Sequence, residues 1–351
     1  MKKIVLLFAT AILAVGCIDD PVYPDTPDDT TTIDRGPRAL VLNEGSWGSN
    51  DASLSLLYTD SGTIDNEWFE VANNRGLGDV AQDMLLHGPK AYVTVTFSNT
   101  LEVVDTATGR STRHTMGGLH PRYLAADGNR LFVSCYGGHQ VVVFDIADLD
   151  HPVANLPLGD FQPEGLAVAG GRLFVASSWI QYQNQNYDYD STVYVFDLAD
   201  YSLVGTVTVG LNPQMAVALD ASRVAVNYSG NYGTGPAGCA IIDANTLEIN
   251  QLERSATGMS AAGGVLYGFS RQGYSSSATA TYWSYDGTSF TDIPVSVNTP
   301  YSISADTAGR LYVTTDGNYI AAGDVLCLTL DGTLLWRSEA GILPKKVIPL
   351  R

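Results

Sequence analysis

The segment Val141–Asp145 reads VVVFD, four apolar residues closed by an aspartate. A strand that is apolar at every position must be covered on both faces. Copies of this phrase recur along the chain, and the aspartates that end them lie 40 to 52 residues apart. The copies are LSLLYTD to Asp60, EVVD to Asp105, VVFD to Asp145, YVFD to Asp197, AIID to Asp243, WSYD to Asp286 and LTLD to Asp331. A period of roughly 40–45 residues predicts a β-propeller, because solenoids repeat nearer 20–30.

Each repeat has the same internal order. A first strand begins near a proline and closes in a Gly- or Asp-containing hairpin turn, which tolerates positive φ. A second strand follows, then a polar loop, the strand that ends in Asp, and a weaker fourth strand. The prolines are Pro121, Pro163, Pro213 and Pro300, and the second strands are RLFV at 130–133, RLFV at 172–175, VLYG at 265–268 and RLYV at 310–313.

The two ends of the chain complement each other. Residues 39–42 form a second strand with no first strand before it, and residues 343–348 form a first strand with no partners after it. We therefore predict an all-β, seven-bladed β-propeller over residues 37–351, closed by pairing of the C-terminal strand with the N-terminal strands. Closure removes the exposed sheet edges that invite aggregation. No helical period is expected after residue 16.

Composition excludes several classes of protein. The 351 residues are 45% apolar, which excludes general disorder, and 19 Lys plus Arg face 37 Asp plus Glu, for a net charge of −18. Such a chain offers no face to a phosphate backbone, so no nucleic-acid partner is expected. Cys135, Cys239 and Cys327 occupy strand positions in different repeats, which predicts buried free thiols.

The N-terminus predicts export and lipidation. Lys2 and Lys3 precede an apolar run at 4–15, which is too short to span a bilayer and matches an export signal. Residues 1–16 thus resemble a bacterial lipoprotein signal, with Cys17 acylated; an ordinary secretory signal is the alternative. Residues 17–36 are rich in Asp and Pro and predict a flexible acidic tether. Acidic residues after the cysteine resemble a surface-export signal, so the expected location is the outer membrane, facing outward, with a periplasm-facing lipoprotein as the alternative.

Catalytic signatures are sparse. The chain has no G-x-S-x-G elbow, H-E-x-x-H pair or phosphate loop. The five histidines fall in different repeats without ligand spacing, and Asp188 with Asp190 makes a weak case for calcium. The sequence therefore predicts no catalytic residues, no metal site and no enzyme.

One set of loops gathers the residues expected to bind a ligand. Loops between second and third strands lie on the same face as the entries to the first strands, and together they are dense in aromatic side chains, amides and guanidinium groups. Such a face suits a large, mostly neutral ligand with rings or amides. The predicted binding residues are Trp47, Asn74, Arg75, Phe97, Arg122, Tyr136, His139, Gln162, Trp179, Tyr182, Tyr187, Gln214, Tyr228, Tyr232, Tyr274 and Tyr319, with Tyr189, His120, Asn212 and Lys345 on the same face.

Several motifs resemble a known family. These are Asn43-Glu44-Gly45, the segments at 51–55 and 77–84, Pro121-Arg122-Tyr123 and the ending Gly341-Ile342-Leu343-Pro344. They are similar to a group of Bacteroidetes surface lipoprotein propellers (YncE-like or NHL-like), the BtuG-like proteins, over most of residues 38–351. The resemblance implies capture of vitamin B12 and other corrinoids, with cobalamin as the bound ligand and a TonB-dependent outer-membrane transporter as partner. No ligand-contacting residue is carried over from the family.

Three other functions stay open at this point. The same face could capture a siderophore, haem or a glycan, although a negatively charged ferric catecholate prefers more cations than this face offers. A propeller hydrolase or lyase would need a clustered acid–base pair. A protein scaffold would bind no small molecule alone.

Overall fold

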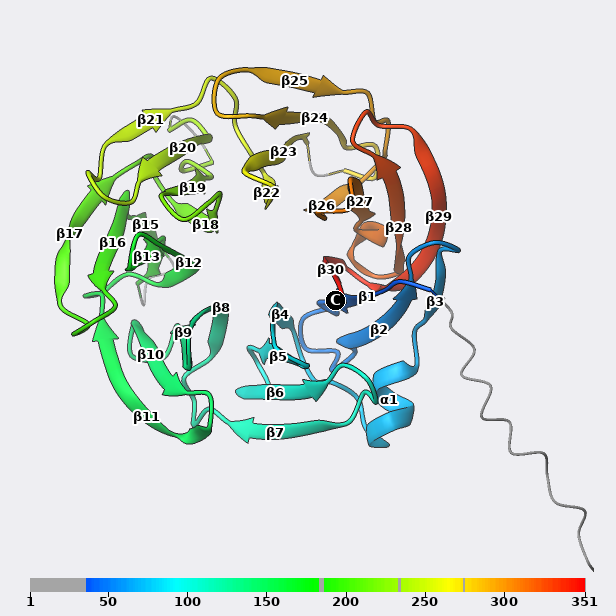
Figure 1. The fold of residues 1–351 in the computed structure, drawn as a ribbon, viewed down its shortest axis with the longest axis horizontal. Coiled ribbons are helices and arrows are strands. Elements are labelled where there is room, and N and C mark those ends of the chain that lie inside the picture. The colour runs from blue at the N-terminus through cyan, green and yellow to red at the C-terminus, as the bar shows by residue number, and fades with distance from the viewer. Residues whose placement is uncertain (1–35, 183–185, 233–234, 274, 351) are drawn as a thin grey trace, which may run out of the picture. The chain divides into compact units, whose positions relative to one another are not determined.

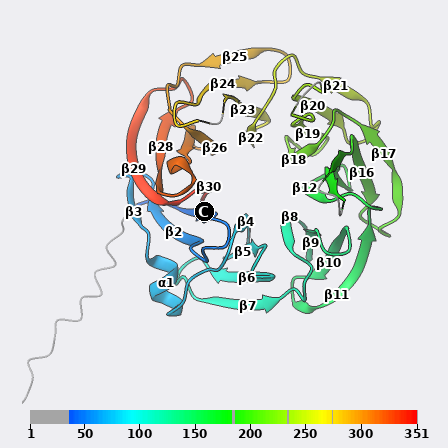
Figure 2. The ribbon, with the colours of Figure 1, turned by 180° about the vertical axis from the view of Figure 1, so that it is seen from behind.

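The computed structural model describes residues 36–350, apart from 183–185, 233–234 and 274. The signal at 1–16, Cys17 and the tether up to residue 35 lie outside the described residues. From Gly36 onward the chain forms one unit, in which seven four-stranded antiparallel sheets surround an axis (Figure 1). The view from behind shows the same closed ring (Figure 2). The predicted seven-bladed propeller is confirmed.

The strands of each blade run in order from the axis outward. The first three blades are β30 (Pro344–Pro349), β1 (Arg38–Asn43), β2 (Ser53–Tyr58) and β3 (Thr63–Asp65); β4 (Ala81–His87), β5 (Lys90–Val95), β6 (Thr100–Asp105) and β7 (Ser111–Thr115); and β8 (Pro121–Asp127), β9 (Arg130–Cys135), β10 (Gln140–Asp145) and β11 (Asp148–Pro157). Blades 4 and 5 are β12 (Pro163–Ala169), β13 (Arg172–Ser177), β16 (Thr192–Asp197) and β17 (Leu203–Thr208); and β18 (Pro213–Ala218), β19 (Arg223–Tyr228), β20 (Gly238–Asp243) and β21 (Ile249–Gln251). Blades 6 and 7 are β22 (Gly258–Ala262), β23 (Val265–Gln272), β24 (Thr279–Tyr285) and β25 (Phe290–Ile293); and β26 (Pro300–Ala305), β27 (Arg310–Thr315), β28 (Ala322–Thr329) and β29 (Leu334–Ile342).

Pairing of the two ends of the propeller closes the ring, as the sequence predicts. The C-terminal strand β30 runs antiparallel to β1, with Val41 opposite Val347 and Leu40 opposite Ile348. The last strand thus becomes the innermost strand of the first blade (Figure 1).

Within the described residues, a helix, a 3-10 turn and a small hairpin interrupt the repeat. Helix α1 (Trp68–Asn73) lies between β3 and β4 at the outer edge of the ring (Figure 1), in a part of the sequence where no helical period is found. It has six residues, too few to show a helical period, and it is anchored by the buried ring of Phe69. A 3-10 turn, η1 (Gly317–Tyr319), lies in blade 7, and the strands β14 (Trp179–Gln181) and β15 (Tyr187–Tyr189) form a hairpin in blade 4.

Apolar side chains fill the space between neighbouring blades. Leu101 of blade 2 belongs to one buried cluster with Val133 of blade 3, and Val143 of blade 3 shares the next cluster with Leu166 of blade 4. This packing covers both faces of each sheet, which explains why the strands that end in Asp are apolar at every position.

Most inner strands begin with a β-bulge. In β8, Pro121 pairs with Cys135 but Leu124 pairs with Val133, so the inner strand carries an extra residue. The hydroxyl of Ser134 accepts the backbone N–H of Tyr123 at 2.9 Å. Comparable shifts occur in β4, β12, β18, β26 and β30. A bulge re-aims the side chains beside it, and here those side chains surround the axis.

Candidate functional site

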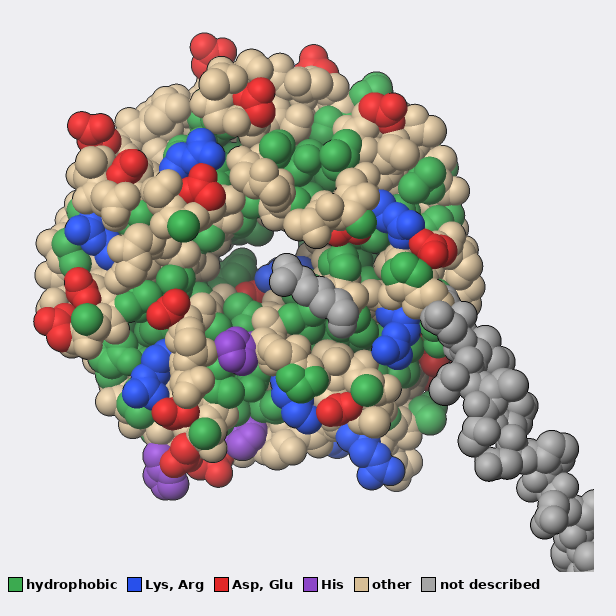
Figure 3. All heavy atoms as spheres, viewed as in Figure 1, with side chains coloured by type: hydrophobic (Ala, Val, Ile, Leu, Met, Phe, Trp, Pro, Cys, Tyr) green, Lys and Arg blue, Asp and Glu red, His purple; other side chains and the backbone are tan. Residues whose placement is uncertain are grey.

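The two faces of the propeller differ in what they carry. We call the face formed by the second-to-third-strand loops and the entries to the inner strands the loop face, and the opposite one the turn face. The hairpin turns lie on the turn face, as do the C-terminus and the point where the chain enters at Gly36, beside Asp60. Figure 3 shows the turn face, which is hollowed at the axis and carries acidic side chains around its rim.

An axial cavity of about 470 Å³ is lined by residues from all seven inner strands. Among the described residues, those that line it nearest to the loop face come from three blades. Ser229 and Tyr232 belong to blade 5, Arg271 lies at the end of β23 in blade 6, and Tyr319 lies in the η1 loop of blade 7. The cavity therefore opens on the loop face over blades 5–7.

The residue after the first position of each bulged inner strand lies beside the axis. Proline opens five of these strands and alanine opens β4, so one bulge repeats six times around the ring. The residues at this position, which we call the bulge ring, are Gln82, Arg122, Glu164, Gln214, Tyr301 and Lys345. Blade 6 has no bulge, because Gly258 and Met259 pair in register with β23.

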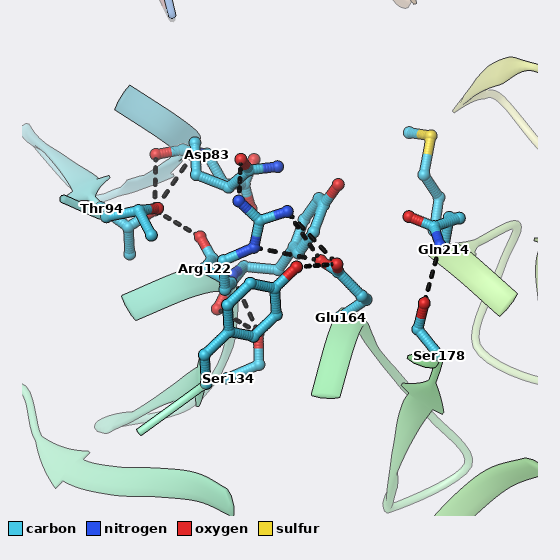
Figure 4. Close-up of polar contacts among 12 residues, drawn as sticks. Asp83, Thr94, Arg122, Ser134, Glu164, Ser178 and Gln214 are labelled. Atoms are coloured by element: carbon cyan, nitrogen blue, oxygen red, sulfur yellow. Dashed lines mark hydrogen bonds and ion pairs between the residues drawn. The ribbon is translucent and has the colours of Figure 1, made fainter. Parts of the chain in front are cut away.

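Blades 2–4 are joined across the bulge ring by one buried network (Figure 4). The guanidinium of Arg122 donates to Glu164, with Nη2 3.0 Å from Oε2, and also to the amide oxygen of Gln82. The hydroxyl of Tyr136 donates to the same carboxylate, and the ring of Tyr136 lies 4.5 Å from the Arg122 guanidinium carbon. Burial disfavours the charge of Arg122, but Glu164 outweighs it and raises the pKa of Arg122. Burial, with Glu164 close by, also raises the pKa of Tyr136 well above its usual value.

Other ion pairs neutralise the rest of this region. Lys346 lies 2.7 Å from Asp83 and Lys345 lies 3.0 Å from Glu44, which also accepts from the hydroxyl of Tyr301. Arg271 lies 2.9 Å from Asp316, and both side chains are buried. With Arg122 and Glu164, four cations face four anions. The site is thus balanced in charge within a chain of net charge −18.

Exposed aromatic side chains of the described residues gather on the loop face. Those classed as exposed are Trp47, Phe97, Tyr182, Tyr187, Tyr232 and Tyr319, and each lies in a second-to-third-strand loop. Aromatic rings of the loop face, exposed or half-buried, make contacts across blade boundaries. Trp47 lies 6.2 Å from Phe97, Tyr136 lies 5.7 Å from Trp179, and Tyr189 lies 6.3 Å from Tyr232, measured between ring centroids.

The structure brings some predicted residues to the cavity. Gln214, Tyr232, Tyr319 and Lys345 line it. Arg122 and Tyr136 belong to the buried network beside it, and Gln214 donates to the hydroxyl of Ser178 at 2.7 Å.

Other predicted residues lie away from the cavity walls. Asn74 caps α1 at the outer edge, and Arg75 forms a two-pronged ion pair with the buried Glu102. Burial opposes the charge of Glu102, but hydrogen bonds from Arg75, Ser111 and Arg113 lower its pKa. Tyr228 donates to Gln251 in the outer strand of its blade. Residues on the loop face outside the cavity lining are Trp47, Phe97, His120, His139, Gln162, Trp179, Tyr182, Tyr187, Tyr189 and Asn212, whereas Tyr274 lies outside the described residues.

Sequence reasoning missed several residues beside the axis. They are Glu44, Gln82, Asp83, Glu164, Arg271, Tyr301, Asp316 and Lys346. A signal for part of this set was present, because Glu164 and Tyr301 directly follow strand-opening prolines, as the predicted Arg122 and Gln214 do. The pairing partners come from other blades and have no comparable local signal.

Among residues 36–350, the three unplaced stretches aside, no three His, Cys, Asp or Glu side chains gather to hold a metal ion. Within the same part of the chain, no helix is both long and apolar enough to cross a membrane.

Comparisons with known proteins define the fold class. No family model matches the chain, and no curated protein matches it in sequence. A quinonprotein alcohol dehydrogenase-like protein from Bacteroides thetaiotaomicron superposes with a TM-score of 0.64 at 14% identity, covering 88% of this chain and 77% of its own. Hydrazine synthase from Kuenenia stuttgartiensis superposes with a TM-score of 0.59 at 15% identity, covering 75% of this chain and 92% of its own. At these identities the likeness shows a β-propeller fold alone, and function must be argued from the site.

Proposed function

We propose that this protein is a cell-surface lipoprotein that binds vitamin B12 and related corrinoids on its loop face. It then passes them to a TonB-dependent outer-membrane transporter. The observation that carries the proposal is the gathering of exposed aromatic rings on the loop face, where Tyr232 and Tyr319 border a cavity whose charges are balanced. A corrinoid is a broad ring system fringed with amide arms, so it needs stacking area and neutral hydrogen-bonding partners rather than net charge.

Binding without catalysis is part of the proposal. The acids beside the axis are Glu44, Asp83, Glu164 and Asp316, and each lies against a cation. A general base or nucleophile must be available to a substrate, whereas these carboxylates hold neighbouring blades together. The matched charges also disfavour an anionic ferric siderophore as the ligand.

Attachment to the outer membrane through Cys17 rests on the sequence of the signal and tether. The chain enters the propeller at Gly36 on the turn face, so the ligand is proposed to bind on the face away from that entry.

The test is calorimetric titration of the chain from Gly36 onward, which contains every blade, with cyanocobalamin. Ferric enterobactin and haem serve as controls. One-to-one binding with a Kd of nanomolar order or tighter, to cobalamin alone, is expected. An absence of heat at tens of micromolar protein would rule out the corrinoid assignment.

Delivery to a transporter is tested in the producing cell. Replacing Cys17 by Ala should release the protein from the membrane and lower uptake of radiolabelled cobalamin when the vitamin is scarce. Unchanged uptake in cells that no longer hold the protein at their surface would contradict delivery.

A further inference from the structure

The walls of the axial cavity are not symmetric about the propeller axis. All seven inner strands contribute to its walls, yet among the described residues those that line it nearest to the loop face come from blades 5–7. On the opposite side, the network of Arg122, Glu164, Tyr136 and Gln82 occupies the corresponding space (Figure 4). Access to the cavity from the loop face is therefore displaced from the axis toward blade 6.

Blade 6 provides the room for this opening. Its inner strand lacks the bulge, so no long side chain projects from the position that carries Arg122 or Tyr301 in other blades. Along this segment the cavity is lined by the small residues Thr257, Gly258, Ser260 and Ala261, together with Met259.

Aromatic side chains stand on both sides of the opening. Tyr232 of blade 5 is 69% exposed, and Tyr319 of blade 7 is also exposed and packs against Tyr301 with ring centroids 6.3 Å apart. Both residues have left-handed backbone conformations, with φ of 56° for Tyr232 and 66° for Tyr319. Non-glycine residues in this region are strained and tend to cluster at ligand clamps.

Polar donors from blades 1, 2 and 5 line the cavity below this opening. Lys345 and Lys346 both line the cavity, each held by a carboxylate, with Gln82 and Gln214 on the same walls. Met215, Met259 and Ile303 line the same cavity and supply apolar surface. Such a cavity suits an arm with an apolar body and an uncharged hydrogen-bond acceptor at its end.

We propose that the ligand binds off the propeller axis, over blade 6, and inserts an amide-bearing arm between Tyr232 and Tyr319 toward Lys345 and Lys346. This inference rests on the proposed function and adds to it the position and the part of the ligand that is recognised. Trp47 and Phe97 do not line the cavity and lie outside this subsite.

The test compares aromatic residues inside and outside the subsite by titration with cyanocobalamin. Tyr232→Ala and Tyr319→Ala should each weaken binding about tenfold or more, whereas Trp47→Ala should change it less than about twofold. Ser229→Trp should block the opening without removing either tyrosine. Ser49→Trp, an exposed loop-face position in blade 1, is its matched control. Circular dichroism checks that each variant is folded.

The outcomes separate the two proposals. If the wild-type chain binds cobalamin but Tyr232→Ala, Tyr319→Ala and Ser229→Trp bind equally well, the off-axis subsite is wrong and the function stands. If the wild-type chain gives no heat with cobalamin, the function is wrong. The subsite is then decided by soaking crystals with nicotinamide, a planar amide. Density between Tyr232 and Tyr319 would support the subsite, and density elsewhere on the loop face, or none, would overturn it.

Discussion

The two halves of the loop face carry the same kinds of residue but form different structures. Over blades 2–4, Arg122, Glu164 and Tyr136 pair with one another and close the space beside the axis. Over blades 5–7, Tyr232 and Tyr319 stand apart and leave a cavity between them. A repeated fold therefore supplies equivalent positions, but the partners across blade boundaries decide which positions are filled by protein and which are left for a ligand.

The largest expected effect on stability comes from breaking the buried Arg122–Glu164 pair over blades 2–4. Glu164 is 1% exposed, and Glu164→Gln keeps its size but leaves the Arg122 charge without its partner. Loss of one partner of a buried pair typically costs about 3–5 kcal/mol, so the free energy of unfolding in urea should fall by about 3 kcal/mol. Asp324→Asn is the control, since its partner Arg337 is 58% exposed, and it should cost less than about 1 kcal/mol. Equal losses in the two variants would show that the network does not stabilise this half.

The boundary between the halves depends on a glycine in blade 4. A Cβ on Gly165 of β12 would lie 2.4 Å from the backbone nitrogen of Ala216 in β18, so the two strands approach closely there. Gly165→Ala should force blades 4 and 5 apart and lower the free energy of unfolding by about 2 kcal/mol. Gly205→Ala meets nothing within 4 Å and should have no comparable cost. A stable Gly165→Ala variant would mean that this boundary is not tightly packed.

The third prediction concerns two buried tyrosines, Tyr136 in blade 3 and Tyr301 in blade 7, which should both stay uncharged up to high pH. Burial, with Glu44 close by, raises the pKa of Tyr301, as burial near Glu164 does for Tyr136. A raised tyrosine pKa stabilises the fold below the unfolded value of about 10, and this contribution is lost as the pH rises through the folded pKa. Tyr136→Phe and Tyr301→Phe should therefore each flatten the alkaline fall in stability, measured by urea unfolding between pH 8 and about 11. A change in only one variant would show that the halves differ electrostatically as well as in shape.

The smallest effect is expected where the aromatic ring is most exposed. Trp47 is 78% exposed, so Trp47→Ala should change the free energy of unfolding by no more than about 0.5 kcal/mol. Urea unfolding followed by circular dichroism measures this directly. A loss above about 1 kcal/mol would mean that the Trp47–Phe97 contact stabilises the fold.

The fold could be predicted from the sequence because short local patterns mark its strands and the closure of the ring. The apolar phrase ending in Asp145 and its copies mark the third strands, the prolines mark most inner strands, and the unmatched ends at 39–42 and 343–348 indicate closure. The helix α1 was missed, since six residues give no periodic signal.

The sequence could predict which face of the propeller carries the site, but not which residues of that face line the cavity. Alternation of strands and loops places Tyr232 and Tyr319 on the loop face with Trp47, but it does not say which of them borders a cavity. Arg75 shows the same limit. Its position before β4 suggested the axis, whereas Glu102 of the third strand holds it in an ion pair away from the cavity walls.

By itself, the sequence determined the number of blades, the closure of the ring and the face on which aromatic residues gather, because strand periodicity and turn residues act over a few positions. Only the tertiary structure decided that Arg122 meets Glu164, that blade 6 lacks a bulge and that the cavity opens off the axis. The Arg122–Glu164 pair and the cavity bring together residues of different blades that lie far apart in the sequence, so the charge and size of a neighbour in another blade determine what each side chain can contact. The missing bulge depends on how β22 pairs with β23 once the blade has formed.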